Sequence, residues 1–467
     1  MNTTKKHRNK IKITALLFAA LILPASSAGA SSLSTNWIMA GVWEGPSGSL
    51  AHHAPQQSRT NTVTADGRLA VFWSQANNLV AGDTNNSSDI FIFDRTTKVT
   101  QRVNLGAGGT QSNGHTRNVT ISADGRYIGF TTAATNTAVG PQCVPGHDCT
   151  FSGVLDRSTG AITVGSKDNS GQLMPVTYGI RPIVTMHTAV ISGDGKSLLF
   201  SATSPSERAP DIYVRNLAAS TTKQANISDQ GIRSQGGVYD PTISNDGRHV
   251  AFSTASSLAA EDNNSLPDVY VRDMLQAKTK VISLEHNGTY PVGNTSESAV
   301  ISGDGQFVVY KAYTTGLPGS PNDISNIFLY NTQNGSTKQI SNAKFGGRPN
   351  GSSYNPSISA DGSHITFLSA ASNLVRADLH DSSDIDIFLY YGNAGITRAI
   401  KLPPRTDVEM SVMGSPVING NGKAITYQLF TRSASNQAAN AHNIYFNYDP
   451  VSYIPFYDPG DILDLLP

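Results

Sequence analysis

The chain has 467 residues, of which only 15% are charged and 42 are glycine, and its 34 basic side chains equal its 34 acidic ones in number. Such a composition favours strands and turns over helices. The length fits two or three ordinary domains or one large all-β domain. The balanced charge excludes a basic protein that binds nucleic acid or an anionic membrane surface.

Residues 1–30 have the three parts of an export signal. A basic start precedes the apolar run "ITALLFAALIL", which is too short to span a bilayer, and small residues lead to a cut after Ala30. An uncleaved anchor is the alternative. Without its five basic residues the mature chain has 29 basic and 34 acidic side chains. No later run is long enough to span a membrane, so we expect a soluble monomer, periplasmic or secreted.

Residues 31–60 form a short segment ahead of the first repeat. Two tryptophans in "NWIMAGVW" (36–43) make it the most apolar part of this segment. We interpret it as an extra strand or plug at the seam between the first and last repeats. The alternative is the start of an incomplete eighth unit.

One phrase recurs seven times between residues 61 and 455. Examples are "VTADGRLAVF" (63–72), "ISADGRYIGF" (121–130) and "ISNDGRHVAF" (243–252). Each copy reads as a strand, an Asp-Gly hairpin turn and a second strand that is apolar on both faces. A longer loop, a third strand such as "IFIFDR", a turn and a polar fourth strand follow. Repeated four-stranded units with buried faces predict an all-β, seven-bladed β-propeller of antiparallel blades; a parallel β-helix is the remaining alternative.

The repeated phrase resembles the TolB-like propeller repeats of exported bacterial proteins, over nearly the whole mature chain. The resemblance implies the fold and says nothing specific about function. TolB itself has an α/β domain ahead of its propeller, whereas only about thirty mature residues precede the first repeat here. The chain therefore does not resemble TolB itself. It also lacks the Gly-x-Ser-x-Gly motif of hydrolases that carry propellers.

The second loop of each unit and the connector to the next unit are long, and both lie at the same end of the blades. Binding residues are expected on such loops, held by a rigid scaffold. Three connector residues are our candidate ligand contacts: His115, Arg348 and Tyr354.

The second loop of unit one, "GDTNNSSDIF", places oxygen-bearing side chains at alternate positions: Asp83, Asn85, Ser87 and Asp89. Such spacing is typical of calcium ligands, although the glycine and distal glutamate of an EF-hand are missing. By alignment Asp378 and Asp384 take the same places in unit six, and Asp262 and Asp268 in unit four. Calcium is the one cofactor that the sequence suggests. The alternative is that these side chains cap turns through backbone N–H groups.

In unit two the same loop contains the only two cysteines of the chain, Cys143 and Cys149. In an exported protein they predict a disulfide. A covalent bond in one blade and acidic side chains in another suggest that the main role of this loop is to stay closed.

No nucleophile–base pair or metal cluster is evident in the sequence. We therefore favour a non-catalytic protein that binds or scaffolds a protein, peptide or glycan partner through its long-loop face. The alternative is a lyase or hydrolase in which His115, His187 and His442 gather around a channel metal. A purely structural role in the cell surface also stays open. Residues 456–467 form either a docking tail or the seal of the last blade.

Overall fold

The computed structural model describes residues 37–39, 61–106, 109–137, 149–174, 176–177, 188–202, 210–283, 295–313, 324–376, 385–400, 408–412, 414–433 and 441–448. All of them belong to one unit that spans Asn36–Pro467. The described residues form strands, turns and loops without an α-helix. Accordingly, no helix in these ranges has the length and apolar character needed to cross a bilayer.

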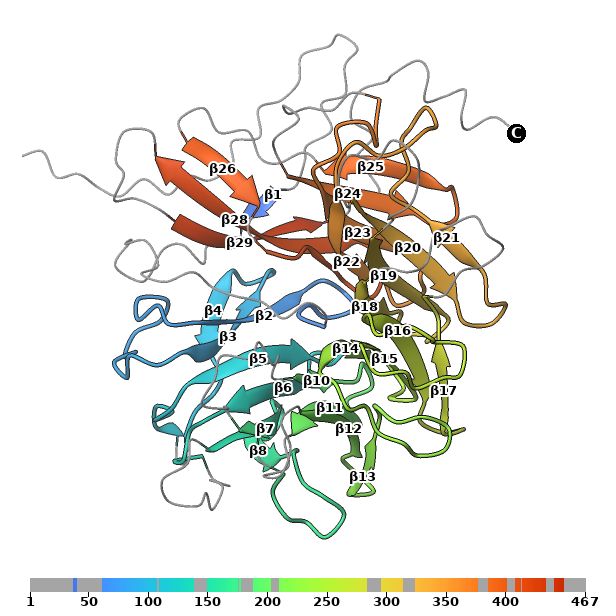
Figure 1. Cartoon of the computed structure of the whole chain (residues 1–467). Coiled ribbons are helices and arrows are strands. Elements are labelled where there is room, and N and C mark those ends of the chain that lie inside the picture. Colours follow the sequence, from blue (N-terminus) through green and yellow to red (C-terminus); the bar gives the residue numbers. More distant parts are fainter. Residues whose placement is uncertain are drawn as a thin grey trace, which may run out of the picture. The chain divides into compact units, whose positions relative to one another are not determined.

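The strands of the first four repeats form four antiparallel sheets (Figure 1). The first sheet contains Leu69–Ser74 (β2), Asp89–Asp94 (β3) and Val99–Arg102 (β4). The second contains Thr116–Ile121 (β5), Tyr127–Thr132 (β6), Cys149–Asp156 (β7), Ala161–Val164 (β8) and, beside β7, Val176–Thr177 (β9). The third contains Ala189–Ile191 (β10), Ser197–Ala202 (β11), Asp211–Asn216 (β12) and Thr221–Gln224 (β13). The fourth contains Val238–Ile243 (β14), His249–Thr254 (β15), Asp268–Asp273 (β16) and Lys278–Val281 (β17).

The last three repeats form three further sheets. The fifth contains Ser296–Ile301 (β18), Phe307–Tyr313 (β19), Ser325–Asn331 (β20) and Thr337–Gln339 (β21). The sixth contains Ser353–Ile358 (β22), His364–Ser369 (β23), Asp386–Tyr391 (β24) and Ile396–Ile400 (β25). The seventh contains Val408–Val412 (β26), Val417–Ile418 (β27), Ala424–Ser433 (β28), Ala441–Tyr448 (β29) and, from the start of the chain, Trp37–Met39 (β1). Strand β1 pairs antiparallel with β29.

The architecture is an all-β propeller with four-stranded antiparallel blades, but the expected number of such blades is wrong. Within the described residues six sheets have four or more strands, and the first has three. Only an isolated bridge between Val63 and Ala70 represents the innermost strand of blade one. Asn61 has a φ of 53°, and its carbonyl accepts a hydrogen bond from Ile121 N–H at 2.6 Å. The Thr62 carbonyl still accepts the Val71 N–H of β2 at 2.8 Å. The innermost segment of blade one is therefore bonded to β2 at Thr62 and to β5 of the next blade at Asn61.

The Ser-x-Asp-Gly turns have the chemistry that the sequence predicts. Ser122 Oγ donates to Asp124 Oδ1 at 2.6 Å and accepts the Tyr127 N–H at 2.9 Å, which closes the turn from inside. The turn glycines of the seven copies have φ between 71° and 78°. Residues with a Cβ rarely adopt this conformation, so the prediction of a glycine-dependent hairpin is confirmed.

A second reason for glycine in these turns comes from the neighbouring blade. A Cβ on Gly195 would lie 2.3 Å from the ring of Tyr127, and a Cβ on Gly362 would lie 2.3 Å from the ring of Phe307. In each case the first residue of a second strand packs directly on the next turn along the chain. The glycine thus serves both the turn and the contact between blades.

The seven turns are bonded to one another in a closed ring. Backbone hydrogen bonds of 2.8–2.9 Å join each turn to the next, from Ala65 through to Gly420. The Asn419 side chain then donates to the carbonyl of Ala65 at 2.8 Å, 354 positions earlier in the chain. This end of the channel is therefore held by the backbone, which leaves functional variation to the opposite, long-loop end.

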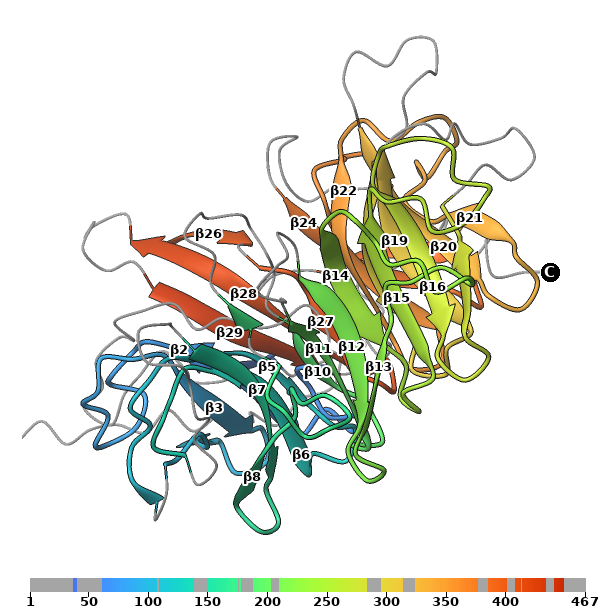
Figure 2. The same cartoon turned by 60° about the horizontal axis from the view of Figure 1, so that its bottom comes forward.

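The hydrophobic core lies in layers between successive sheets. Neighbouring side chains of one strand face different layers: Phe91 packs with Phe72 in one cluster, whereas Ile90 packs with Val119 and Ile128 of blade two in another. The sheets of blades four and five likewise lie face to face (Figure 2). Each fully buried side chain of this size contributes about 1.5–3 kcal/mol. This burial on both faces explains why the second and third strands are apolar throughout.

Candidate functional site

The acidic loop of blade one is folded around an arginine whose side chain is only 11% exposed. Arg102, on β4, places Nη1 3.4 Å from Asp83 Oδ1 and 3.3 Å from Asp89 Oδ2. Asn104 Nδ2 donates to Asp89 Oδ1 at 2.6 Å, and Gln111 Nε2 donates to Asp83 Oδ1 at 2.9 Å. Both carboxylates are buried. Each therefore has a cationic and an amide partner supplied by the protein.

The other two predicted ligands, Asn85 and Ser87, are bonded to each other and Asn85 also to Asp89, since Asn85 Nδ2 donates to Asp89 Oδ2 at 3.4 Å. Asn85 Oδ1 accepts the N–H of Ser87 at 2.9 Å, which forms the turn-capping contact of the structural alternative. Asn85 Nδ2 donates to the Ser112 carbonyl at 2.7 Å. Burial raises the pKa of Asp83 and of Asp89, although Arg102 opposes the shift in both. No group of three or more His, Cys, Asp or Glu side chains in the described ranges is arranged to hold a metal ion.

The calcium hypothesis for blade six stays a prediction, because Asp378 and Asp384 lie outside the described residues. The strand register does, however, correct the alignment. Asp386 begins β24 and pairs with Ser369, as Asp89 begins β3 and pairs with Ser74. Asp386, and not Asp384, is thus the counterpart of Asp89.

A polar clamp at the start of the third strand recurs in four blades. In each, a side chain fifteen residues further along donates to the first residue of that strand, or in blade five to the second, and accepts the next N–H. The pairs are Asn104–Asp89, Asn226–Asp211, Ser283–Asp268 and Ser341–Asn326. The acidic residue at the start of the third strand therefore helps to fix the chain where that strand lies beside the start of the connector.

The disulfide predicted for blade two also stays a prediction. Cys143 lies outside the described residues, and Cys149 is described only as the first position of β7.

The structure separates the three candidate ligand contacts. His115 is anchored, since its Nδ1 accepts the Ser88 N–H at 2.9 Å. Arg348 is exposed on the connector to blade six, and its carbonyl accepts a hydrogen bond from Asn373 Nδ2 at 2.8 Å. Tyr354 lies on the innermost strand β22, half-buried, and burial raises its pKa. Whether any of them binds a ligand is untested and stays a prediction.

Two connectors fold against the outer strands of the blade that follows them. The connector before blade three folds against the outer strands of that blade, where Asn169 Oδ1 accepts the Thr222 N–H at 2.6 Å. The connector before blade four does the same: Asp229 accepts the Thr279 N–H at 2.7 Å and the Lys278 ammonium at 2.8 Å. The innermost strands themselves are therefore left to line this end of the channel.

Four innermost strands contain the same bulge near their connector end. A left-handed residue with φ between 47° and 59° shifts the register in each strand: Asn118, Asp240, Ser298 and Asn355. The residue just before it is at least partly exposed in a strand whose other end is buried. We call these four side chains the channel-mouth ring: Arg117, Tyr239, Glu297 and Tyr354. Non-glycine residues in this conformation are uncommon and often lie near functional sites.

The ring combines aromatic, cationic and anionic side chains. Arg117 lies over the Trp73 ring, 5.4 Å from its centroid, and its Nε donates to Ser88 Oγ at 3.2 Å. Glu297 forms an ion pair with Lys311, and Lys311 lies 4.9 Å from the centroid of Tyr313. Tyr239 is 39% exposed. Only Tyr354 of this set was predicted from the sequence, although each member stands seven residues before the aspartate of its turn.

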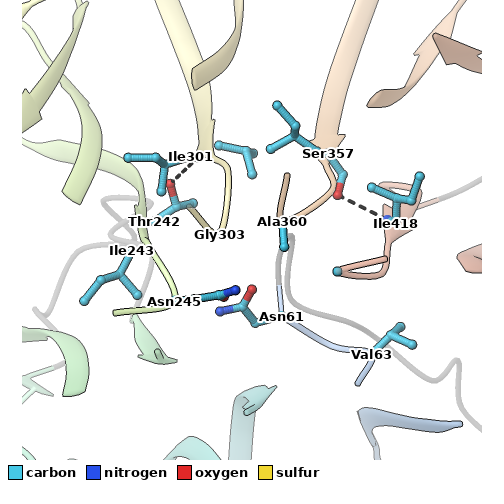
Figure 3. A pocket seen from close by; sticks show the side chains of 13 residues that line it. Asn61, Val63, Thr242, Ile243, Asn245, Ile301, Gly303, Ser357, Ala360 and Ile418 are labelled. Atoms are coloured by element: carbon cyan, nitrogen blue, oxygen red, sulfur yellow. Dashed lines mark hydrogen bonds between the residues drawn. The ribbon is translucent and has the colours of Figure 1, made fainter. Parts of the chain in front are cut away.

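The opposite end of the channel is narrow and neutral. Its cavity of about 50 Å³ is lined by the ends of the innermost strands and by the turns, including Asn61, Asn245, Gly303 and Ala360. The side chains of Asn61 and Asn245 lie close together there (Figure 3). This volume holds a few water molecules. No lining residue of this described cavity is acidic, basic or histidine.

Comparison with solved structures places the chain in the structural class of β-propellers. An oligogalacturonate lyase in complex with manganese has a TM-score of 0.51 at 13% identity, over 88% of this chain and 96% of that one. The oligogalacturonate lyase from Vibrio parahaemolyticus gives a TM-score of 0.50 at 12% identity, over 86% and 92%. TolB from Acinetobacter baumannii gives 0.34 at 15% identity, over 82% of each chain.

At these identities the similarity extends to the fold alone, and a TM-score as low as that of TolB supports no argument. No protein-family model matches the chain, and no curated protein matches its sequence. The specific resemblance to TolB-like repeats therefore stays a prediction, whereas membership of the propeller class is shown.

Proposed function

We propose that the chain is an exported, non-catalytic β-propeller that binds a protein, peptide or glycan partner at the long-loop end of its channel. The observation that carries this proposal is the channel-mouth ring. Equivalent positions of four rigid strands present Arg117, Tyr239, Glu297 and Tyr354. Tyrosine and arginine are the residues that dominate binding energy at recognition sites.

The two ends of the channel differ in rigidity and in chemistry, as expected of a scaffold that binds a ligand at one end. The turn end is closed by backbone hydrogen bonds and has a neutral cavity for water. The mouth presents variable side chains on strands that do not need to move. A preformed site of this kind loses little conformational entropy on binding.

The test is a binding screen with purified protein against defined oligosaccharides and peptides, in which wild type is compared with Tyr239→Ala. The proposal expects a ligand whose affinity falls about tenfold in the variant, as for a removed aromatic contact. Leu275→Ala is the matched control, because Leu275 is 74% exposed in the turn after β16, at the other end of the blade. Equal binding by Tyr239→Ala and wild type would overturn the proposed site.

A second candidate function is a channel-centred lyase with a histidine-bound metal. The fold similarity to a manganese-containing oligogalacturonate lyase is the observation in its favour. Of the three histidines considered, His115 already uses Nδ1 for the Ser88 N–H; His187 lies outside the described residues, and only the backbone pairing of His442 is described. Cleavage of oligogalacturonate that depends on added Mn²⁺ and is lost in His187→Ala would favour this candidate over the first.

Export to the periplasm or the exterior is part of the proposal. It is supported by the signal-like composition of residues 1–30. A mature N-terminus at Ser31, found by mass spectrometry of the secreted or periplasmic fraction, is the expected result.

A further inference from the structure

Ser88 in the second loop of blade one forms hydrogen bonds with two side chains of blade two. His115 Nδ1 accepts the Ser88 N–H at 2.9 Å, and Arg117 Nε donates to Ser88 Oγ at 3.2 Å. Ser88 itself is fully buried. The imidazole of His115 and the guanidinium of Arg117 are thus oriented by one buried residue, and the guanidinium lies 5.4 Å from the centroid of the Trp73 ring.

The outer nitrogens of His115 and Arg117 are donors that have no partner among the described residues. Because Nδ1 of His115 accepts a hydrogen bond, a neutral imidazole carries its proton on Nε2. Burial and the nearby Arg117 lower the pKa of His115, which keeps the imidazole neutral at pH 7. Within the described part of the chain, neither His115 Nε2 nor the terminal nitrogens of Arg117 make a hydrogen bond or an ion pair.

No carboxylate of the described residues forms an ion pair with Arg117. Asp89, whose charge acts on His115, is fully buried and is already bonded to Asn104 and Arg102. A half-buried guanidinium with free terminal N–H groups is suited to a planar, charged acceptor.

We propose that His115 and Arg117, oriented by Ser88, bind the terminal carboxylate of a peptide at the junction of blades one and two. This inference rests on the proposed function and names the ligand class of the long-loop end. Arg117 donates its two terminal nitrogens to the carboxylate, as guanidinium groups do in bidentate pairs. His115 adds a third hydrogen bond from Nε2.

The rest of the channel mouth favours a peptide over a glycan that carries a carboxylate on every sugar. Asp240 stands on the innermost strand of blade four, and a polyanionic chain along the ring would meet its like charge. A peptide has its carboxylate at one end only. Tyr239 and Tyr354 then offer contacts for its uncharged part.

The experiment uses the full mature chain and a mixed-sequence heptapeptide library, prepared once with free C-terminal carboxylates and once with C-terminal amides. Binding is measured for wild type, Arg117→Gln and His115→Asn. Asparagine at position 115 keeps an acceptor for the Ser88 N–H and removes the Nε2 donor. Arg376→Gln is the control, because Arg376 is an exposed arginine over an aromatic ring, Phe345, on the second loop of blade six.

We expect capture of the carboxylate library, with affinity that falls on the order of tenfold to a hundredfold on amidation or in Arg117→Gln, as for a lost charge-assisted pair. The loss in His115→Asn should be smaller, and Arg376→Gln should bind as wild type does. Thermal melts of the variants check that each is folded; Arg117→Lys, which keeps the charge, replaces Arg117→Gln if the latter does not fold.

The outcomes separate this inference from the proposed function. Equal binding of amidated and free peptides, with binding still lost in Tyr239→Ala, would overturn the carboxylate site and leave the proposed function standing. Binding of tetragalacturonate in place of the peptides, dependent on Arg117, would also overturn the peptide assignment. Failure of wild type to bind any peptide or glycan probe would overturn both.

Discussion

Blades one and four have the same acidic loop and stabilise it in different ways. In blade one the guanidinium of Arg102 lies between Asp83 and Asp89. In blade four the hydroxyl of Tyr270 donates to Asp262, the counterpart of Asp83. The remaining contacts match, since Asn104 and Ser283 occupy the same place in the polar clamp.

The strand register produces this difference. Phe91 pairs with Arg102 in blade one, and Tyr270 pairs with Val281 at the same position in blade four. The two rings pack alike: Phe91 stacks on Phe72 with centroids 5.6 Å apart, and Tyr270 stacks on Phe252 at 5.8 Å. A buried carboxylate needs a partner, and either a cation on the fourth strand or a hydroxyl on the third can supply it. The same loop is thus held closed by different partners of its buried carboxylate in the two blades. A bound metal ion would be a third kind of partner.

The largest expected effect is that of Arg102→Val. It leaves two buried carboxylates without their cation, and removing one partner of a buried ion pair costs about 3–5 kcal/mol. Chemical denaturation measures the loss. Arg126→Val is the control, because its ion pair with Asp156 has an arginine that is 47% exposed, and an exposed pair contributes at most about 1 kcal/mol. Equal losses in the two variants would contradict the role of Arg102.

Tyr270→Phe should cost less, about 1–3 kcal/mol, because it removes a neutral donor from the buried Asp262. The variant reproduces the ring of blade one without its arginine. Denaturation again measures the effect, and Tyr239→Phe, on an exposed tyrosine, should be neutral. A neutral result for Tyr270→Phe would mean that the hydroxyl does not stabilise the loop.

Phe91→Tyr, added to Arg102→Val, converts blade one to the arrangement of blade four. We expect it to recover about 1–2 kcal/mol of the loss, since the new hydroxyl reaches Asp83 as Tyr270 reaches Asp262. A double-mutant cycle gives the coupling. Additive losses would show that the two blades are not interchangeable at this position.

The pH dependence of stability should show a smaller effect. Burial raises the pKa of Asp89 above its usual value, so the folded state binds its proton more tightly than the unfolded state does. The stability that this group contributes is therefore fully present below its unfolded pKa and is lost as the pH rises through the folded pKa. Asp89→Asn should flatten that part of the curve relative to wild type. An unchanged difference between pH 4 and pH 7 would contradict the shift.

The smallest expected effect is that of calcium on blade one, which should be none. Arg102 already lies between the two carboxylates of this loop, so Asp83→Asn should leave the response of the melting temperature to calcium unchanged. In blade six Phe388 takes the place of Phe91 and pairs with Ala399, which takes the place of Arg102. Blade six therefore has neither the arginine of blade one nor the tyrosine of blade four at these positions. A calcium-dependent rise in melting temperature that is lost in Asp378→Asn would assign the ion to blade six; one lost in Asp83→Asn would contradict the pairing in blade one.

The sequence predicted the repeat, the turns and the strands because these depend on neighbouring residues. Asp124 and Gly125 specify their turn within five residues, and the alternating faces of β3 follow from its apolar run. The number of complete blades was not predictable in the same way. The segment around residue 63 has the sequence of an innermost strand, but within the described residues it forms only an isolated bridge to β2, and the Asn61 carbonyl is bonded to blade two.

The candidate site was only partly predictable. Tyr354 was selected, and the other three members of the channel-mouth ring were missed, because the signal is a fixed distance from the turn and not a local motif. The loop of blade six was misaligned because it is longer (370–385, against 75–88 in blade one) and contains an aspartate at both candidate positions. Only the pairing of Asp386 with Ser369 decides between them.

The amino-acid sequence by itself determined that this chain is a repeated array of antiparallel strands joined by Asp-Gly turns, because side-chain alternation and glycine geometry act over a few residues. Only the tertiary structure decided what each repeated position does. Asp83 meets Arg102 through the pairing of two strands, and Arg117 meets His115 through Ser88 of another blade. Contacts between strands and between blades depend on register and ring closure, which bring together residues that no local pattern connects.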